Sequence, residues 1–300
     1  MQRQRRILYK TLPFHLMLAV PVLFLLIFAY VPMGGIIIAF QNYHPGLGFL
    51  RSRWVGLGNF EYIFKLPNFL PVLRNTMYIA FLKIVLNIVI PVGFALLLNE
   101  VQSRWFKKAV QTITYLPYFL SWVIFGGILR DFLAPGGPVN NAITSLGGAS
   151  VYFLGNVQIF PLTMAVTDTW KNFGFNTIVY LAALTGIDPN LYEAAAVDGA
   201  NRLKQTLHIT MPGILPIVSL MTILSIGNIL NAGFDQIFNL YSPIVYSTGD
   251  IIDTLVYRIG IIDARYSIST AIGLFKSVVS LILITGSYKL ADKYAGYRVF

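Results

Sequence analysis

The chain has 300 residues, of which 56% are hydrophobic and only 11% are charged, and it contains no cysteine. Because soluble domains carry about 25% charged residues, this composition excludes an ordinary soluble protein and is typical of a polytopic membrane protein. We interpret the net charge of +10 as a record of membrane topology rather than as a nucleic-acid surface. The absence of cysteine excludes thiol catalysis and disulfides, and the scattered histidines predict no metal site.

Six apolar stretches are long enough to cross a bilayer as helices. The first follows a cationic amino terminus and is too long for a signal peptide, so we interpret it as an uncleaved span. We therefore expect an all-α polytopic membrane protein in which residues 1–300 form a single transmembrane domain. A short amphipathic surface helix is also expected over residues 59–69. The expected spans cover residues 12–40, 76–98, 110–129, 159–184, 214–234 and 270–290.

The distribution of Lys and Arg predicts the orientation of these spans. An even number of spans places both termini on one side, and that side, with the second and fourth loops, carries twelve of the 22 Lys and Arg residues. The opposite loops carry seven and the spans three. Because cytoplasmic loops are enriched in Lys and Arg, both termini are predicted to be cytoplasmic.

The cytoplasmic loop over residues 185–213 has the clearest local signals. Asp188 and Pro189 provide a helix N-cap and a proline suited to the first turn, so a short helix is predicted to begin there. Gly199 is well placed to end this helix, and a second helical piece is predicted over Asn201 to Ile209. Pattern alone leaves two interpretations open, a docking helix for a protein partner and an amphipathic linker resting on the membrane.

The residues of this loop resemble a known signature. Glu193-Ala194-Ala195, three residues, Gly199, nine residues and Ile209-Thr210-Met211-Pro212 resemble the EAA loop of binding-protein-dependent ABC importer permeases, with Met211 in place of a leucine. Flanking stretches narrow the resemblance to the maltose-type, carbohydrate-importing permeases. These stretches are Trp170-Lys171, Ile178 to Leu184 and Leu191 to Ala200. Others resemble the polysaccharide and oligosaccharide branch, namely Trp54 to Leu57, Asn59-Phe60, Asn75-Thr76, Asp253-Thr254, Val256 to Arg258, Tyr266-Ser267 and Thr270 to Phe275.

The resemblance implies a permease subunit of an ATP-driven importer that moves oligosaccharides into the cytoplasm across a bacterial cytoplasmic membrane. It implies four partners besides the lipid bilayer: a second, homologous permease that forms a heterodimer with this chain, two copies of an ABC ATPase, and an extracytoplasmic sugar-binding protein. No Gly-x-x-x-x-Gly-Lys-Ser/Thr phosphate loop occurs in the sequence, so we predict no catalytic residue and no cofactor on this chain. ATP and magnesium are expected on the partner ATPase. The residues implied to couple to that ATPase are Glu193, Ala194, Ala195, Asp198 and Gly199.

Polar residues inside the predicted spans are candidates for a substrate pathway, because a Lys or Asp at the centre of a membrane helix costs about 2.5 to 3.5 kcal/mol. Amides and charged groups can hydrogen-bond the hydroxyls of a sugar. For Asp168 and Lys171, three residues apart, a self-neutralising pair on one helix face is an equally open interpretation. The candidates are Lys83, Asn87, Asp168, Lys171, Asn172, Asn228, Asn231 and Lys276.

The sign of the charge in the spans suggests a hypothesis about the cargo. The predicted spans contain three lysines, Lys83, Lys171 and Lys276, but only one clear acid. This excess of positive charge suggests that the cargo includes acidic sugars. The alternative is that these lysines pair with carboxylates or carbonyls of the partner permease.

Two functions of other classes stay open. One is an ion-coupled secondary transporter of a small polar solute, with Asp168 and Asp235 as carriers of the ion. The other is a membrane scaffold or sensor that recruits cytoplasmic proteins through the loop at Glu193.

Overall fold

The computed structural model describes the backbone of residues 2–295 and the side chains of residues 11–290 and 292. Helices dominate the described chain, and its strands are β1 (Gln41–Asn42) and β2 (Arg53–Trp54), which pair antiparallel. The chain divides into two compact units. The first contains the residues up to Leu66 together with Val256–Leu274, and the second contains Pro67–Leu255 and the residues from Phe275 onward.

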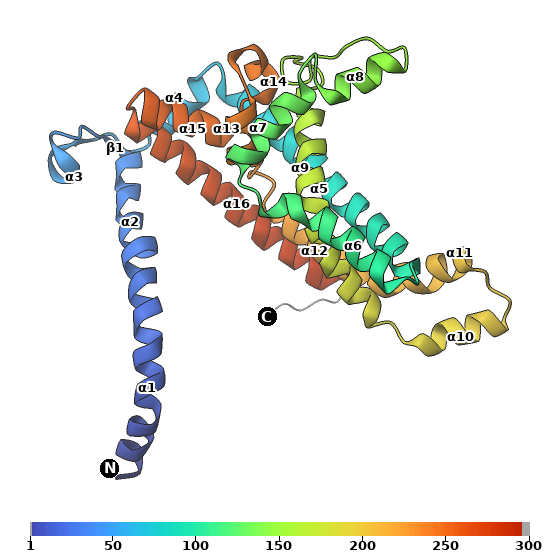
Figure 1. Cartoon of the computed structure of the whole chain (residues 1–300). Coiled ribbons are helices and arrows are strands. Elements are labelled where there is room, and N and C mark those ends of the chain that lie inside the picture. The colour runs from blue at the N-terminus through green and yellow to red at the C-terminus, as the bar shows by residue number, and fades with distance from the viewer. Residues whose placement is uncertain (1, 296–300) are drawn as a thin grey trace. The chain divides into compact units, whose positions relative to one another are not determined.

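The first unit begins with a long apolar helix that agrees with the first predicted span. It consists of α1 (Gln2–Leu25), a π-helical turn (Leu26–Tyr30), α2 (Val31–Met33) and a 3₁₀ turn (Gly34–Phe40). Beyond it lie the hairpin of β1 and β2, which carries α3 (Gly48–Arg51), and then α4 (Gly58–Lys65) (Figure 1). Helix α4 confirms part of the predicted amphipathic helix, because it buries Ile63 and exposes Glu61 and Lys65, but it ends at Lys65 and not at residue 69.

The second unit is organised around α5 (Phe69–Glu100) and α9 (Phe160–Thr185), which pack along each other. Its core includes Ile79, Leu129 and Met164, all fully buried. The other helices along the chain are α6 (Arg104–Tyr115), α7 (Trp122–Leu133), α8 (Pro138–Ser145), α10 (Pro189–Val197), α11 (Arg202–Gln205), α12 (Met211–Gly227), α13 (Phe234–Leu240), α14 (Tyr246–Gly249), α15 (Ile252–Tyr257) and α16 (Tyr266–Ala295). Short 3₁₀ turns occupy Leu116–Phe119 and Pro243–Val245, and π-helical turns occupy Thr206–Thr210 and Arg258–Ile262.

Four helices in the described part of the chain are long and apolar enough to cross a membrane, and a bent pair of helices would make a fifth crossing. The protein is therefore an all-α polytopic membrane protein. Helix α9 coincides with a predicted span, but it is not among the four because its charged and amide side chains lower its mean hydropathy. The count of six spans and the cytoplasmic termini stay predictions, since the side chains of terminal cations such as Arg3 and Arg298 lie outside the described residues. The four helices are Thr11–Phe40, Phe69–Glu100, Arg202–Gly227 and Tyr266–Leu290.

The third predicted span, residues 110–129, is not one straight helix. The chain bends by 107° between Arg104–Phe119 and Trp122–Ser145. Pro117 has no N–H to continue the α-helical hydrogen bonding, the chain forms a 3₁₀ turn over Leu116–Phe119, and Leu120 is extended. The Ser121 side chain then accepts a hydrogen bond from the Ile124 N–H and so caps a new helix.

The fifth predicted span, residues 214–234, is shifted toward the amino terminus. A continuous helix runs over Arg202–Gly227, because the π-helical turn at Thr206–Thr210 leads directly into α12. The prolines near the start of α12 do not interrupt it. The helix ends seven residues earlier than predicted. Beyond it the chain turns back on itself and reaches Gly233, whose φ of +89° is unfavourable for any L side chain.

Candidate functional site

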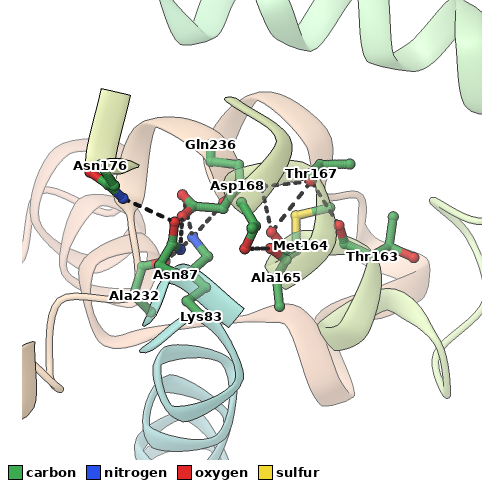
Figure 2. Close-up of polar contacts among 11 residues, drawn as sticks. Lys83, Asn87, Thr163, Met164, Ala165, Thr167, Asp168, Asn176, Ala232 and Gln236 are labelled. Carbon is green, nitrogen blue, oxygen red and sulfur yellow. Dashed lines mark hydrogen bonds and ion pairs between the residues drawn. The ribbon is translucent and has the colours of Figure 1, made fainter. Parts of the chain in front are cut away.

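A buried charge pair joins α5 to α9 in the second unit. The Nζ of Lys83 lies 3.3 Å from Oδ1 of Asp168. Lys83 also donates to the backbone carbonyl of Ala232, at 2.6 Å, and to the side-chain oxygen of Gln236 (Figure 2). Since an ammonium group has three N–H donors, these three acceptors satisfy it fully. Lys83 is therefore held in place and has no free donor for a ligand.

Two amides extend this pair along the same helices. Oδ2 of Asp168 accepts a hydrogen bond of 2.9 Å from the Asn87 amide. The Asn87 carbonyl in turn accepts one of 3.3 Å from Asn176. Lys83 and Asn87 are four residues apart on α5 and therefore lie on one face of that helix. The carboxylate of Asp168 thus has a partner on each oxygen.

Gln236 completes the network, although no sequence pattern singled it out. Its side chain on α13 is fully buried, and its Nε2 donates to the Met164 carbonyl and to Thr167 Oγ1, both at 2.8 Å. Its side-chain oxygen accepts a hydrogen bond from Lys83 (Figure 2). It can reach Lys83 because the chain turns after α12. A glutamine beyond the end of a predicted span carries no pattern that would identify this role.

This network borders a cavity of about 320 Å³. Five of the eight predicted pathway residues line it: Lys83, Asn87, Asp168, Asn228 and Asn231. The remaining lining residues are Ala80, Ile84, Met221, Leu224, Ser225, Ala232 and Gly233. The cavity wall mixes polar and apolar side chains, and because the charges of Lys83 and Asp168 cancel, these residues carry no net charge.

Lys171 lies elsewhere and does not form an ion pair with Asp168, whose ammonium partner is Lys83. Its Nζ donates to the backbone carbonyl of Tyr118 at 2.7 Å and lies 5.4 Å from the ring centres of Tyr118 and Trp122. These contacts fall on either side of the bend between the two helices of the third predicted span. Lys171 therefore stabilises that bend through a carbonyl and two aromatic faces.

The other two candidates are also away from the cavity. The Lys276 ammonium on α16 lies 2.5 Å from Asp253 Oδ1 on α15. Asn172 is half-buried on α9 and does not line the cavity. Since Lys83, Lys171 and Lys276 all have partners within this chain, none of them needs a second permease to be satisfied.

The loop that resembles the EAA signature folds as predicted. Asp188 caps α10 by accepting a hydrogen bond of 2.9 Å from the Asn190 N–H. At the other end Gly199 has a φ of +75°. The N–H groups of Gly199 and Ala200 bond back to the carbonyls of Ala196 and Ala195, which is the glycine-ended C-cap of Schellman. Strong local signals at both ends thus define this short helix.

Helix α10 exposes most of its surface. Glu193, Ala194, Asp198 and Gly199 are exposed and Ala195 is half-buried, while the neighbouring Val197 is 88% exposed. Small side chains and open space allow another protein to approach the helix backbone closely. The five residues predicted to couple to an ATPase are therefore accessible in this chain.

The base of this loop is tied to the neighbouring helices. Tyr192 OH lies 3.0 Å from Thr210 Oγ1, and Arg202 forms an exposed ion pair of 3.0 Å with Glu100 at the end of α5. Helix α11 is capped by Asn201, which accepts from the Lys204 N–H. The loop is therefore a defined piece of structure and not a loose connector.

The sequence has clear relatives among membrane transport proteins. Residues 89–293 match the family described as binding-protein-dependent transport system inner membrane component. The polygalacturonan/rhamnogalacturonan transport system permease protein YteP of Bacillus subtilis (strain 168) is 41% identical over 303 residues, covering 100% of this chain and 94% of that protein. The arabinooligosaccharides transport system permease protein AraP of the same strain is 29% identical, covering 91% and 86%.

Solved structures of an importer share the fold. The chain matches a bacterial ABC transporter involved in the import of the acidic polysaccharide alginate, with a TM-score of 0.88, 37% identity, and coverage of 97% of this chain and 99% of that one. It also matches a bacterial alginate ABC transporter in complex with an alginate pentasaccharide-bound periplasmic protein, with a TM-score of 0.86, 37% identity and coverage of 96% of each chain.

Proposed function

The chain belongs to the binding-protein-dependent transport system inner membrane component family, and on that basis we propose that it is the permease subunit of an ATP-driven importer of oligosaccharides, acidic ones included. Its relatives by name transport polygalacturonan or rhamnogalacturonan and arabinooligosaccharides, and its structural neighbour imports alginate. Family membership separates this proposal from the ion-coupled secondary transporter and the membrane scaffold, which the sequence pattern left open.

The proposed assembly supplies the chemistry that this chain lacks. A second, homologous permease forms the other half of the pathway in a bacterial cytoplasmic membrane. Two ABC ATPases bind ATP and magnesium and dock on α10, and an extracytoplasmic binding protein delivers the cargo. Support for the last partner comes from the neighbouring structure, in which an alginate-bound periplasmic protein is present.

One observation carries the proposal: a short turn joins the exposed helix α10 to an uninterrupted helix that reaches the cavity. Residues Arg202–Gly227 form that helix, and Ser225 and Asn228 at its far end line the cavity. This rigid helix can therefore transmit a movement that an ATPase imposes on α10 to the cavity wall. Glu193, Ala194, Ala195, Asp198 and Gly199 provide the docking surface in this scheme.

The cavity suits a hydroxyl-rich cargo with carboxylates. Asn228 and Asn231 line it, and amide side chains can both donate to and accept from hydroxyl groups. Asp168 would repel an anionic sugar if it were alone, but Lys83 at 3.3 Å neutralises it. We assign Lys83 the role of masking this charge, and we assign Asn87, Asp168, Asn228 and Asn231 to the pathway wall. Lys171 and Lys276 have structural roles in this scheme, and Asn172 lies outside the pathway.

The experiment is uptake into proteoliposomes that contain the complex copurified with this chain. Radiolabelled galacturonic-acid trimer and an arabinose trimer are offered with the copurified binding protein outside and ATP inside. We expect accumulation that requires ATP and survives collapse of the proton gradient by an uncoupler. Uptake that ignores ATP and disappears with the uncoupler would overturn the proposal, as would recovery of the chain without an ATPase.

A further inference from the structure

The segment after the first membrane-capable helix is a rigid hairpin. Strands β1 and β2 pair Gln41 with Trp54 and Asn42 with Arg53. Inside the hairpin, the Gln41 amide donates to the Phe49 carbonyl at 2.9 Å, and Ser52 Oγ donates to the Gly48 carbonyl at 2.6 Å. A polar scaffold therefore fixes the backbone of the loop from residue 43 to residue 52.

The hairpin is fastened to the end of the span. The ring of Trp54 stacks on that of Phe40, the last residue of the span, with 5.8 Å between the centroids. The Val55 N–H donates to the Phe40 carbonyl at 2.8 Å, and the Asn59 amide donates to the Ala39 carbonyl at the same distance. The loop thus has a fixed position beside the end of α2 (Figure 1).

This rigid scaffold holds large apolar side chains outward instead of packing them. Leu50 is 101% exposed, Trp54 is 59% exposed, and Leu47 and Phe49 are each about half exposed. The exposed residues between them include Arg51 and Arg53. No Asp or Glu occurs between residues 41 and 60. The outer surface of the hairpin is therefore a mixture of aliphatic, aromatic and cationic groups.

The position of the hairpin along the chain sets its depth. The helix Thr11–Phe40 has 30 residues, which corresponds to about 45 Å, whereas the hydrocarbon core of a bilayer is about 30 Å thick. Its end therefore lies at the level of the lipid head groups. Tryptophan and arginine are the side chains that favour this level, and exposed leucine and phenylalanine favour the adjoining acyl region.

We propose that the hairpin of residues 41–54, with α3 at its tip, is an interfacial membrane anchor. Leu47, Phe49 and Leu50 enter the outer part of the acyl region, Trp54 lies at the head groups, and Arg51 and Arg53 bind lipid phosphates, with a preference for anionic lipids. We favour lipid as the occupant because the hairpin directly follows a helix that is long and apolar enough to cross the membrane. The end of that helix, and therefore the hairpin, lies next to lipid. Anchoring the end of this span fixes its depth and tilt in the bilayer.

The absence of cysteine makes this proposal directly testable. Leu50→Cys introduces the only thiol of the chain, at a position where a label meets no neighbour. The matched control is Leu146→Cys, 88% exposed, directly after α8 and between the third and fourth predicted spans. Each variant is labelled with a nitroxide in the copurified complex and placed in vesicles of phosphatidylethanolamine and phosphatidylglycerol. The complex with the unsubstituted chain, labelled in the same way, gives the signal of any partner cysteine for subtraction. Power saturation in electron paramagnetic resonance then measures how often the nitroxide collides with two relaxing agents. One is oxygen, which concentrates in the membrane, and the other is a water-soluble nickel chelate.

The expected result is that oxygen reaches the label at position 50 several-fold better than nickel does, with the opposite order at position 146. Arg51→Gln with Arg53→Gln should shift position 50 toward nickel, and so should vesicles without phosphatidylglycerol. Nickel access at position 50 equal to that at position 146 would overturn the proposal, since the hairpin would then lie in water. Shielding from both oxygen and nickel would also overturn it, because a protein subunit and not lipid would then cover the hairpin.

Discussion

Lys83 and Asp168 neutralise each other across two helices, with 3.3 Å between Nζ and Oδ1, while both line the same cavity. The ammonium is satisfied by its three acceptors, so its contribution to the cavity is electrostatic. Changing either partner alters the charge of the wall, and changing both restores neutrality.

Lys83→Met is therefore expected to reduce uptake of an acidic oligosaccharide more than uptake of a neutral one. The uncompensated Asp168 would repel a carboxylate by about 1 to 2 kcal/mol at an effective dielectric constant near 20, or about tenfold in transport. The measurement is the ratio of galacturonic-acid trimer to arabinose trimer taken up by proteoliposomes. The double variant Lys83→Met with Asp168→Asn is the control and should recover the wild-type ratio. Equal losses for the two cargoes in both variants would show that the pair has only a structural role.

Gly199→Leu should uncouple ATP hydrolysis from transport. The φ of +75° at this position costs an L residue about 1 to 2 kcal/mol, and a leucine would also project from the end of the docking helix. We expect uptake to fall by tenfold or more while ATPase activity persists. Gly147→Leu is the matched control, because Gly147 also has a positive φ, of +85°, and open space around its Cα. Normal uptake by the Gly199 variant would remove the coupling role from this end of α10.

Gly174→Ala is expected to loosen the contact between α6 and α9. A Cβ at this position would lie 2.3 Å from the Thr114 carbonyl oxygen, so the two helices would have to separate. Forced overpacking of this kind costs about 1 to 3 kcal/mol. Thermal unfolding in detergent, followed by size-exclusion chromatography, should show a lower midpoint. Gly93→Ala on α5, where a Cβ meets nothing within 4 Å, should leave the midpoint unchanged or raise it.

Lys276→Met should lower stability without changing cargo preference. It leaves Asp253 without its ammonium partner at 2.5 Å, in a pair whose side chains are each about one-fifth exposed. We expect a loss of about 2 kcal/mol, below the 3 to 5 kcal/mol of a fully buried pair, and partial recovery when Asp253→Asn is added. The thermal midpoint tests stability, and the cargo ratio tests the alternative. A changed ratio would return Lys276 to the substrate pathway.

The parts of the fold that could be predicted from the sequence depend on neighbouring residues. Asp188, Pro189 and Gly199 start and end α10 through contacts within a few residues, and the structure confirms that helix. Most of the long apolar stretches correspond to helices for the same reason. The bend after the third predicted span was missed because an apolar average passes over Pro117 and Ser121, which end one helix and begin the next.

The candidate site could be predicted only as a set of residue types. Which acid Lys83 pairs with depends on how α5 packs against α9, and that packing joins residues 85 positions apart. The alternative pair, Asp168 with Lys171, fits the helix spacing equally well and is not the one that forms. Gln236 reaches the network through a turn, so no periodic pattern could identify it.

The helix Arg202–Gly227 has 26 residues, so it is a rod about 39 Å long. If the end near α10 acted as its pivot, a tilt of about 5° would displace the other end by about 3 Å, since displacement grows with the length of a rigid arm. That displacement exceeds the 2.6 Å that separates Lys83 Nζ from the Ala232 carbonyl a few residues beyond the rod. A small rotation at the α10 end would thus be amplified into the making or breaking of a single hydrogen bond at the cavity.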